Sequence, residues 1–304
     1  MKLIKARDNL SEQLTDMETV GLAVTEHLIY HHNYKVAILD VDEQRGRDES
    51  LRLGPSCLGL HVDITDYAAQ AQAFLTTFEW GGNRLDLFFA NAGIGDKDSL
   101  YQDLYALDEK TGLPAPLDLR TIDVNLSAVI QGIHLARHFF SEKNNKQGGH
   151  IVATSSVVGL YPNYCIPLYA ASKHGITGLV RSLAPVYAKD NITINSIHPT
   201  IIETNLMPKE AAKEFNQPGQ VTPMGTAFKA FDAILDAKYT LTGQTMELSL
   251  DDVVFKQQPE YSTDNIRWMF GDQATMWEKV AAPLMPRPPG ENAVAVKVPE
   301  KRFI

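Results

Sequence analysis

The sequence predicts an α/β fold in which helices cover both faces of one doubly wound parallel sheet. Strand-like and helix-like segments alternate from about residue 20 to residue 200, as βα units around a parallel sheet do. The strand-like segments are continuous apolar runs, which is typical of strands buried on both faces. With 304 residues, of which 44% are hydrophobic, the chain is long enough to form a single domain around a substantial core.

Six apolar runs are predicted as strands. The clearest are Lys35–Asp40, which ends in a carboxylate, and Leu85–Ala90, which runs directly into Asn91. The residues ahead of them, Asn9–Leu14, are polar at most positions and do not look like a buried central strand. The first strand of the sheet is therefore expected to be atypical or missing. The strands are expected at 35–40, 59–62, 85–90, 151–154, 192–197 and 244–248.

Five segments carry apolar residues at helical spacing. The helices are expected at 21–29, 67–78, 118–140, 168–189 and 225–237. Residues 199–224 have scattered prolines and no clear period, so we expect an irregular lid of the kind that closes over a ligand. We therefore divide the chain into an atypical N-terminal segment (1–19), one domain that includes the lid (20–250) and a C-terminal extension or tail (251–304).

Composition excludes several classes of function. The formal net charge of -9 argues against a nucleic-acid surface, because no segment gathers enough Lys or Arg to neutralise a run of phosphates. Cys57 and Cys165 are the only two cysteines, too few for a disulfide framework or a four-thiolate zinc site. No apolar run approaches the roughly 20 residues that a membrane helix needs. We expect a cytoplasmic protein that acts on a small molecule and binds neither nucleic acid nor membrane.

Tyr169, Lys173 and Ser156 form the candidate catalytic set. Tyr169 and Lys173 are four residues apart in a predicted helix, so their side chains lie on one face. A phenol with a pKa near 10 is a poor base, but a neighbouring ammonium is expected to lower that pKa. Ser156 lies thirteen residues before Tyr169 at the carboxyl end of a predicted strand, where open α/β sheets bind ligands. Ser155 is a rival, but the thirteen-residue spacing favours Ser156.

Doubly wound sheets of this class can bind a dinucleotide, and a carboxylate at the end of the second strand, as at Asp40, then bears on the choice of cofactor. A carboxylate at the end of this strand accepts hydrogen bonds from both hydroxyls of an adenosine ribose and repels a 2′-phosphate. NAD is therefore favoured over NADP, although Arg45 and Arg47 lie nearby and are able in principle to bind a phosphate.

Five motifs occur in one order along the chain: ANAG at Ala90–Gly93, VNLSAVIQG around Asn125, SS at Ser155 and Ser156, YAASK at Tyr169–Lys173, and INSIHPTIIET at Ile194–Thr204. With them the chain resembles the short-chain dehydrogenase/reductase family over residues 20–250, and it is expected to have that family's Rossmann-type fold. LTGQTMELS at 241–249 resembles the branch that contains 15-hydroxyprostaglandin dehydrogenase and many fungal alcohol dehydrogenases.

The resemblance implies a role for each matching residue. Tyr169 would be the general base, Lys173 would lower its pKa and hold the nicotinamide ribose, and Ser156 would stabilise the reacting oxygen. Asn125 would hold a water that links Lys173 to solvent. The implied cofactor contacts are Gly21, Asp40, Asp63, Ile64, Asn91, Ala92, Gly93, Tyr169, Lys173, Ile202 and Thr204.

Several of these residues also have purely structural interpretations. Asn125 is explained as well by a hydrogen bond to backbone. Asp63 is explained as well by a turn or helix cap, a role that Thr65 and Asp66 are also able to fill. Among the nine histidines, the pairs His31–His32 and His134–His138 come closest to metal spacing, but neither has a third ligand in view. We expect no metal.

One feature of the family is absent. The glycine-rich turn that lets a helix N-terminus approach a pyrophosphate is not found. With its last glycine aligned on Gly21, the chain has Leu14, Thr15 and Thr19 where the pattern has Thr, Gly and Gly. It also has Asp16 and Glu18 there, and carboxylates beside a pyrophosphate are repulsive. Three accounts remain open. The N-terminal residues are not the native ones, for example because of a wrongly assigned first exon; or the protein has lost tight dinucleotide binding; or residues 2–5 form a substitute strand.

These observations favour an oxidoreductase that transfers a hydride between NAD and a secondary alcohol or its ketone. The alternative is a non-catalytic relative that binds a partner or a ligand. Apolar residues in and near the lid suggest a hydrophobic or polyketide-like substrate: Leu206, Met207, Phe215, Met224, Phe228 and Phe231. Helices 118–140 and 168–189 are expected to pair subunits into a homodimer or homotetramer, as the family resemblance implies.

Overall fold

The computed structural model describes residues 19–101, 107–143, 145, 147–202, 219–238 and 240–272. All six predicted strands are present, with ends that lie within two residues of the prediction, and a seventh strand follows them. The strands are β1 (Val36–Asp40), β2 (Cys57–His61), β3 (Leu87–Ala90), β4 (Gly149–Thr154), β5 (Ile192–Pro199), β6 (Thr245–Ser249) and β7 (Asp252–Phe255).

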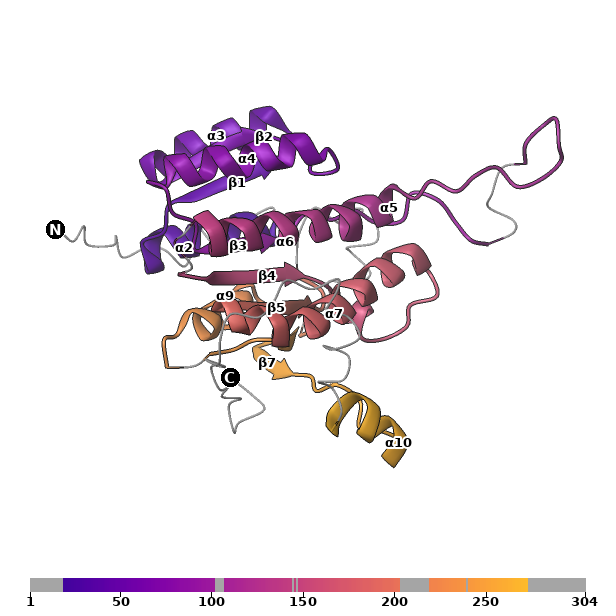
Figure 1. The fold of residues 1–304 in the computed structure, drawn as a ribbon. Coiled ribbons are helices and arrows are strands. Elements are labelled where there is room, and N and C mark those ends of the chain that lie inside the picture. Colours follow the sequence, from indigo (N-terminus) through magenta and orange to yellow (C-terminus); the bar gives the residue numbers. More distant parts are fainter. Residues whose placement is uncertain are drawn as a thin grey trace.

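The helices alternate with the strands as predicted (Figure 1). The α-helices are α2 (Val20–His32), α3 (Glu43–Leu53), α4 (Tyr67–Trp80), α5 (Arg120–Ile122), α6 (Ala128–His138), α7 (Pro167–Tyr187), α9 (Met224–Leu235) and α10 (Asp264–Arg267). Short 3-10 turns are η2 (Gly54–Ser56), η6 (Val157–Gly159) and η7 (Ala188–Asp190), and π-helical turns are η4 (Asp123–Ser127), η5 (Phe139–Lys143) and η8 (Trp268–Asp272). The predicted helix 118–140 thus corresponds to α5, η4, α6 and the start of η5, which follow one another without a gap. The hydrogen-bonding pattern changes to π-helical within η4.

The sheet is divided into two parts within the described residues. One part contains β1 and β2, and the other has the order β3-β4-β5-β6-β7. All pairs are parallel except β6–β7. The strands beside the division are only partly buried, at every residue of β1 and at three of the four residues of β3, whereas seven of the eight residues of β5 are buried. The division lies at the place in the sheet where the first strand would be expected, and the sequence has no recognisable strand for that place.

Helices cover both faces of the five-stranded part, so the predicted doubly wound α/β class is confirmed. On one face α4, α6 and α7 pack on β3, β4 and β5, with Phe74, Ile133 and Val180 in the core. On the other face α2 and α9 pack on β4, β5, β6 and β7, with Leu28 and Phe231 in the core. Figure 1 shows α6 and α7 in front of the sheet and α9 behind it.

Three elements lie outside the predicted set: α3, β7 and the short α10. Helix α3 has almost no apolar period, because only Gly46 and Leu53 are buried; its N-cap Asp42 and the ion pair between Glu43 and Arg47 stabilise it instead. Strand β7 pairs with β6 and buries Val253 and Phe255. The sheet therefore continues past residue 250, where the sequence placed the start of the C-terminal extension.

The small β1–β2 part depends on a close approach between two glycines. A Cβ added to Gly59 on β2 would lie 2.2 Å from the carbonyl oxygen of Gly46 on α3, whereas a Cβ added to Gly46 would meet nothing within 4 Å. We expect Gly59→Ala to lower the free energy of unfolding by about 1–3 kcal/mol through overpacking. Gly46→Ala, the matched control, should raise it by about 0.5–1 kcal/mol because alanine stabilises a helix interior. Urea denaturation measures both, and equal stability of the two variants would contradict this packing.

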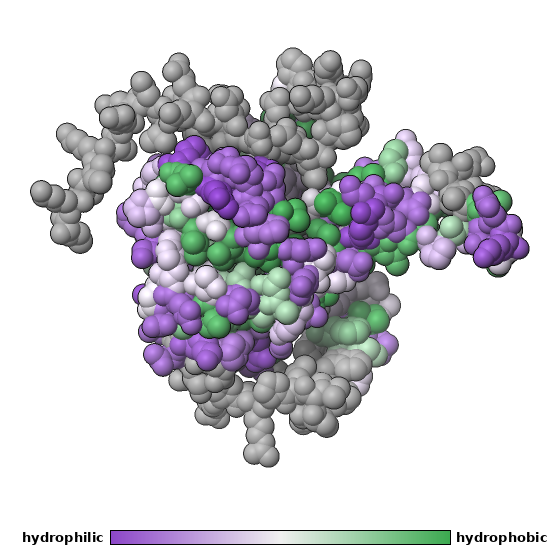
Figure 2. All heavy atoms as spheres, turned by 90° about the horizontal axis from the view of Figure 1, so that it is seen from above, coloured by the Kyte–Doolittle hydropathy of each residue, from purple (hydrophilic) through white to green (hydrophobic). Residues whose placement is uncertain are grey.

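None of the helices in the described ranges is long and apolar enough to cross a membrane. The segment between β3 and α5 extends away from the body on the right of Figure 1. Figure 2 shows a mixed surface in which hydrophobic side chains gather at the base of this segment. The exposed apolar residues of the segment include Leu100, Tyr101, Leu107, Leu113 and Leu119.

Candidate active site

The predicted catalytic residues meet at the carboxyl edge of the five-stranded part. Ser155 and Ser156 follow directly after β4, and α7 carries Tyr169 and Lys173 across the same edge. The Lys173 side chain is buried, with only 2% of the residue exposed. Its Nζ donates a hydrogen bond to the carbonyl oxygen of Thr154, at 2.8 Å, and lies 5.4 Å from the centroid of the Tyr169 ring. The structure therefore brings Tyr169 and Lys173 together as the helical spacing predicted.

The electrostatics of this pair differ from the expectation. We predicted that Lys173 lowers the pKa of Tyr169, but burial raises that pKa above 10.0, and a hydrogen bond with the Ser156 side chain offsets only part of the effect. The reason is that the phenol itself is buried, which disfavours the charged phenolate. Burial lowers the pKa of Lys173 to about 8, because a dry environment disfavours the charged form.

The two serines have different environments. Ser155 is 1% exposed, and its hydroxyl donates to the carbonyl oxygen of Lys173 at 2.8 Å. Ser156 is half-buried, caps the 3-10 turn η6 by accepting from Val158 N, and hydrogen-bonds with Tyr169. Ser155 thus helps to hold α7 on the sheet, and Ser156 is the serine that faces the phenol.

His198 holds the backbone of Ser156 through a hydrogen bond to its carbonyl oxygen. It lies at the end of β5, is 0% exposed, and its Nδ1 is 2.9 Å from the carbonyl oxygen of Ser156. A carbonyl only accepts, so Nδ1 carries the proton, and Nε2 accepts from the Ser196 hydroxyl at 2.8 Å. His198 was not among the predicted site residues, although it lies within the motif INSIHPTIIET.

His198 should make the protein sensitive to acid. Burial lowers the pKa of His198 from 6.5 to about 4, so between these values the unfolded chain binds a proton that the folded protein does not. The free energy of unfolding should therefore fall as the pH drops from 6.5 to 4, by on the order of 3 kcal/mol from this residue. Urea titrations across this range should give a flatter profile for His198→Gln. An unchanged pH slope in the variant would contradict the assignment.

Asn125 joins the interrupted helix to the loop after β3. Its amide group pairs with the backbone of Ile94 in both directions, donating to the carbonyl oxygen and accepting from the N–H, each at 2.8 Å. It also donates to the Ser172 hydroxyl at 3.3 Å. The residue is fully buried in the π-helical turn η4, and such turns are frequent at functional sites. Asn125 therefore forms the backbone hydrogen bonds that its structural interpretation predicts. The water that it would hold stays a prediction.

Asp96 is a further positioning residue that sequence reasoning missed. Its carboxylate accepts from Leu168 N at 3.1 Å and from Tyr169 N at 2.5 Å. The first N–H groups of a helix have no partner within the helix, and the cap residue Ile166 offers no side-chain bond. Asp96 therefore caps α7 from the loop after β3 and fixes the backbone that carries Tyr169.

Gly21, Asn91 and Gly93, which the resemblance assigns to the cofactor, lie close to Thr154 and Lys173. Asn91 accepts from the Thr154 hydroxyl at 2.9 Å, and a Cβ on Gly21 would lie 2.7 Å from Asn91 Nδ2. A Cβ on Gly93 would lie 3.4 Å from Lys173 Nζ. Gly21 and Gly93 thus keep this edge open beside Asn91 and Lys173, and Ala92 lies between Asn91 and Gly93 in the same loop.

The adenosine end shows a mixture of available and engaged groups. Asp40 Oδ1 accepts from Asp42 N at 2.9 Å, which leaves Oδ2 for a ribose hydroxyl. Asp63 accepts from both the N–H and the hydroxyl of Thr65, so its structural interpretation as a turn residue is present. Asp66, not Asp63, caps α4, and the Ile64 carbonyl accepts from Gln70 at 3.1 Å.

The N-terminus of α2 is already capped. The Thr19 hydroxyl accepts from Leu22 N at 3.2 Å, so one N–H that would otherwise face a pyrophosphate has a partner. The described residues therefore offer hydrogen-bonding groups to a dinucleotide at Asp40 and Lys173, and the helix N-terminus offers fewer donors to its phosphates than an uncapped one.

The lid is described only at its two ends. Thr204, Leu206, Met207 and Phe215 lie outside the described residues, and Ile202 is half-buried at the start of the lid. The two ends are tied together, since the hydroxyls of Thr200 and Thr222 hydrogen-bond and Leu250 N donates to Thr222.

The contribution of two aromatic residues to a substrate pocket was predicted wrongly. Phe231 is 0% exposed and packs against Phe89 at a centroid distance of 4.8 Å. Phe228 stacks on His27 of α2. Phe231 therefore packs on the sheet, and Phe228 packs on α2.

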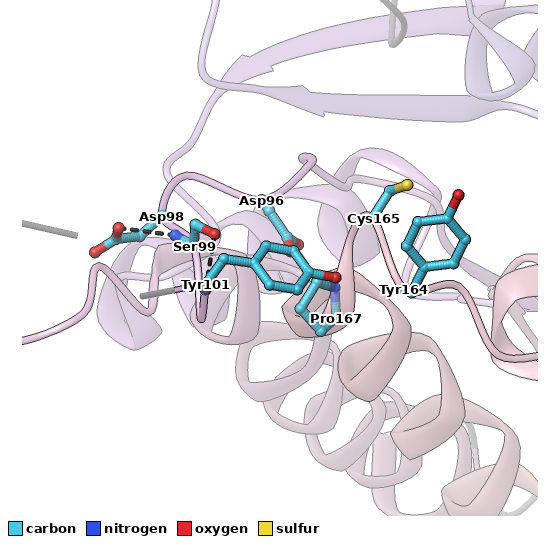
Figure 3. A pocket seen from close by; sticks show the side chains of 7 residues that line it. All are labelled: Asp96, Asp98, Ser99, Tyr101, Tyr164, Cys165 and Pro167. Carbon is cyan, nitrogen blue, oxygen red and sulfur yellow. Dashed lines mark hydrogen bonds between the residues drawn. The ribbon is translucent and has the colours of Figure 1, made fainter. Parts of the chain in front are cut away.

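A cavity of about 500 Å³ opens beside the N-terminus of α7. It lies between the loop after β3 and the loop before α7, and Figure 3 shows the rings of Tyr101 and Tyr164 on either side of Pro167. The lining residues are Asp96, Asp98, Ser99, Tyr101, Tyr164, Cys165 and Pro167. Because Asp96 binds the backbone N–H of Tyr169, the cavity adjoins the catalytic helix.

Comparison with known proteins identifies the family. A model of the short chain dehydrogenase family matches residues 15–214. This chain belongs to the short-chain dehydrogenase family. The family prediction is thus confirmed, and the chain is a short-chain oxidoreductase by membership.

The relatives include fungal and mammalian members of the family. The chain is 32% identical to the short-chain dehydrogenase/reductase prx7 of Penicillium rubens over 71% of this chain and 77% of that protein. It is 29% identical to a 15-hydroxyprostaglandin dehydrogenase of Rattus norvegicus, whose name specifies NAD(+), over 74% of this chain and 80% of that protein. A crystal structure of a 3-ketoacyl-(acyl-carrier-protein) reductase from Brucella melitensis, complexed with NADH, has the same fold, with a TM-score of 0.61, 21% identity, and coverage of 74% of this chain and 91% of that chain.

Proposed function

We propose that this short-chain dehydrogenase interconverts a secondary alcohol and its ketone with NAD as the hydride carrier. The observation that carries the proposal is the arrangement of Ser156, Tyr169 and Lys173 at one sheet edge, with a phenol that hydrogen-bonds with a serine and a buried ammonium beneath its ring. Bound NAD supplies the group that accepts or returns the hydride. The protein's own residues bind the substrate oxygen and move its proton.

Ser156 and Tyr169 divide the work on the substrate oxygen. The Ser156 hydroxyl orients that oxygen, and the Tyr169 phenol exchanges a proton with it. Because burial raises the pKa of Tyr169, the phenol holds its proton at neutral pH and is suited to protonate a ketone oxygen. The reverse reaction needs the phenolate, so alcohol oxidation should speed up as the pH rises toward that pKa.

Asp40 supports NAD rather than NADP. The side chain lies at the end of β1 with Oδ2 available, and a carboxylate there repels a 2′-phosphate. Lys173 is placed to bind the nicotinamide ribose, because its ammonium has three donors and the Thr154 carbonyl takes one.

The cavity beside α7 supports an apolar substrate. Tyr101, Tyr164 and Pro167 give it large carbon surfaces, and it adjoins the helix that carries Tyr169. Names of relatives, such as the 15-hydroxyprostaglandin and (-)-trans-carveol dehydrogenases, refer to hydroxylated molecules with large apolar parts. We therefore propose that a hydrophobic secondary alcohol or ketone binds in this cavity, with its carbinol or carbonyl carbon toward Tyr169.

Titration of the purified protein with NADH, followed by nucleotide fluorescence, tests the proposal. We expect saturable binding, with NADPH binding at least about tenfold more weakly because of the repulsion at Asp40. Asp40→Ala should reduce this preference. A folded protein without a saturable signal would contradict the enzyme function and favour the non-catalytic alternative.

We also propose a cytoplasmic homodimer or homotetramer that pairs through α6 and α7. Ile130 on α6 is 42% exposed, which leaves an apolar side chain for such a contact. Light scattering after size exclusion gives the oligomeric state, and a monomer at micromolar concentration would contradict the pairing.

A further inference from the structure

A cluster of imidazoles and one carboxylate joins α2 to α9, away from the catalytic edge. Asp232 Oδ1 lies 2.7 Å from His27 Nε2 and 2.7 Å from His32 Nε2. The ligand atoms of the three residues all lie within 4.8 Å of one another. His27 and His32 are in the second half of α2, whereas the helix N-terminus faces the proposed cofactor.

We propose that His27, His32 and Asp232 bind a divalent transition-metal ion of the Zn²⁺ class and fasten α2 to α9. Two imidazole nitrogens and one carboxylate oxygen converge on a single point, which is a common donor set for such ions. Around a tetrahedral Zn²⁺ with bonds of about 2.0–2.1 Å, the ligand atoms are about 3.3 Å apart. To admit the ion, the atoms that are 2.7 Å apart must separate by about 0.6 Å, and atoms up to 4.8 Å apart must approach by up to about 1.5 Å.

The surroundings hold the imidazoles in place. The His27 ring stacks on Phe228 of α9, with centroids 4.5 Å apart and an angle of 1° between the planes. It contacts the His32 ring edge-on at 5.2 Å and the His31 ring at 4.8 Å. Because His27 packs on an aromatic ring from the other helix, its side chain loses little further freedom when a ligand binds.

The exposure of the three side chains fits an ion with open positions. The His27 side chain is 10% exposed and that of His32 is 24% exposed, whereas that of Asp232 is 51% exposed. The protein thus supplies three ligands from the inner side, and water completes the coordination from the outer side. The hard ions Mg²⁺ and Ca²⁺ prefer all-oxygen sites, so the two imidazoles select against them.

The position of the cluster explains what the ion would do. Helix α2 leads into β1, and β1 and β2 form a sheet part that has no strand pairing with the rest among the described residues. An ion between α2 and α9 would fasten this part to the helix layer of the five-stranded part. We therefore assign the ion a structural role, independent of the proposed reaction.

Sequence reasoning missed this cluster and predicted no metal. His27 and His32 are five residues apart on the helix, and Asp232 is 200 residues from His32, so no spacing along the chain indicates a common site. Only the packing of α2 on α9 brings the three side chains together.

The experiment uses the tag-free, EDTA-treated full-length chain and Zn²⁺ alone. We expect calorimetry to find one Zn²⁺ per chain, a rise in melting temperature with Zn²⁺ but not with Mg²⁺, and visible absorption of a low-coordinate complex with Co²⁺. Asp232→Asn decides between an ion site and a hydrogen-bonded cluster, because the amide oxygen still accepts from both imidazoles while the carboxylate ligand is lost. We expect this variant to bind Zn²⁺ at least about tenfold more weakly.

His32→Ala should weaken Zn²⁺ binding likewise, and His134→Ala is the matched control, because His134 belongs to the other histidine pair and is exposed on α6. Far-UV circular dichroism establishes that each variant is folded. Wild-type protein that binds no Zn²⁺, or an Asp232→Asn variant that binds it as tightly as wild type, would overturn the proposal.

Discussion

Replacing Tyr169 by Phe should lower kcat by at least about 100-fold, the contribution expected of a positioned general acid or base. The change removes the hydroxyl that hydrogen-bonds with Ser156 and leaves the ring that packs above Lys173. Because Tyr169 is half-buried and its shape is kept, the variant should fold and still bind NADH. Steady-state rates with a hydrophobic secondary alcohol or ketone, together with an NADH titration, measure the two effects separately.

Tyr161→Phe is the matched control for this prediction. Tyr161 is 46% exposed, and its hydroxyl donates to Glu247 Oε2 at 2.7 Å, so the same chemical change is made outside the proposed catalytic set. Its kcat should stay within a fewfold of wild type. If Tyr169→Phe retained wild-type activity, Tyr169 could not be the proton donor and acceptor.

Replacing Lys173 by Met should lower kcat by on the order of 100-fold and weaken NADH binding at the same time. The ammonium lies beneath the Tyr169 ring and beside Gly93, so its removal affects both the phenol and the ribose site. Exposed Lys238 on the loop after α9 is the control, and Lys238→Met should change neither quantity. Unchanged NADH affinity in Lys173→Met would contradict the ribose contact.

The same variant has a distinctive pH dependence. The pKa of Lys173 is about 8 in the folded protein against 10.5 for an unperturbed lysine. Between these values the unfolded chain binds one more proton at this residue, so Lys173 makes the free energy of unfolding rise with pH. Lys173→Met removes this contribution, and urea titrations from pH 8 to 10 should show a smaller rise than wild type. Parallel profiles would indicate that the pKa of Lys173 is not lowered.

The local sequence determined the six predicted strands and which residues meet at the candidate site. Apolar runs located six strands to within two residues, because buried parallel strands are apolar at nearly every position. The four-residue spacing placed Tyr169 and Lys173 on one helix face, and the position of Ser156 after a strand brought it to the same edge. These features depend on neighbours along the chain, so a short stretch of sequence is enough to predict them.

Only the tertiary structure decided the environment of those residues. The direction of the Tyr169 pKa shift depends on how much of the phenol is buried, and Asp96 and His198 act through contacts with distant segments. The division of the sheet beside β1 and the meeting of His27 with Asp232 likewise arise from how whole elements pack. Desolvation and the convergence of side chains from distant segments are properties of three-dimensional packing, so the spacing of residues along the chain does not predict them.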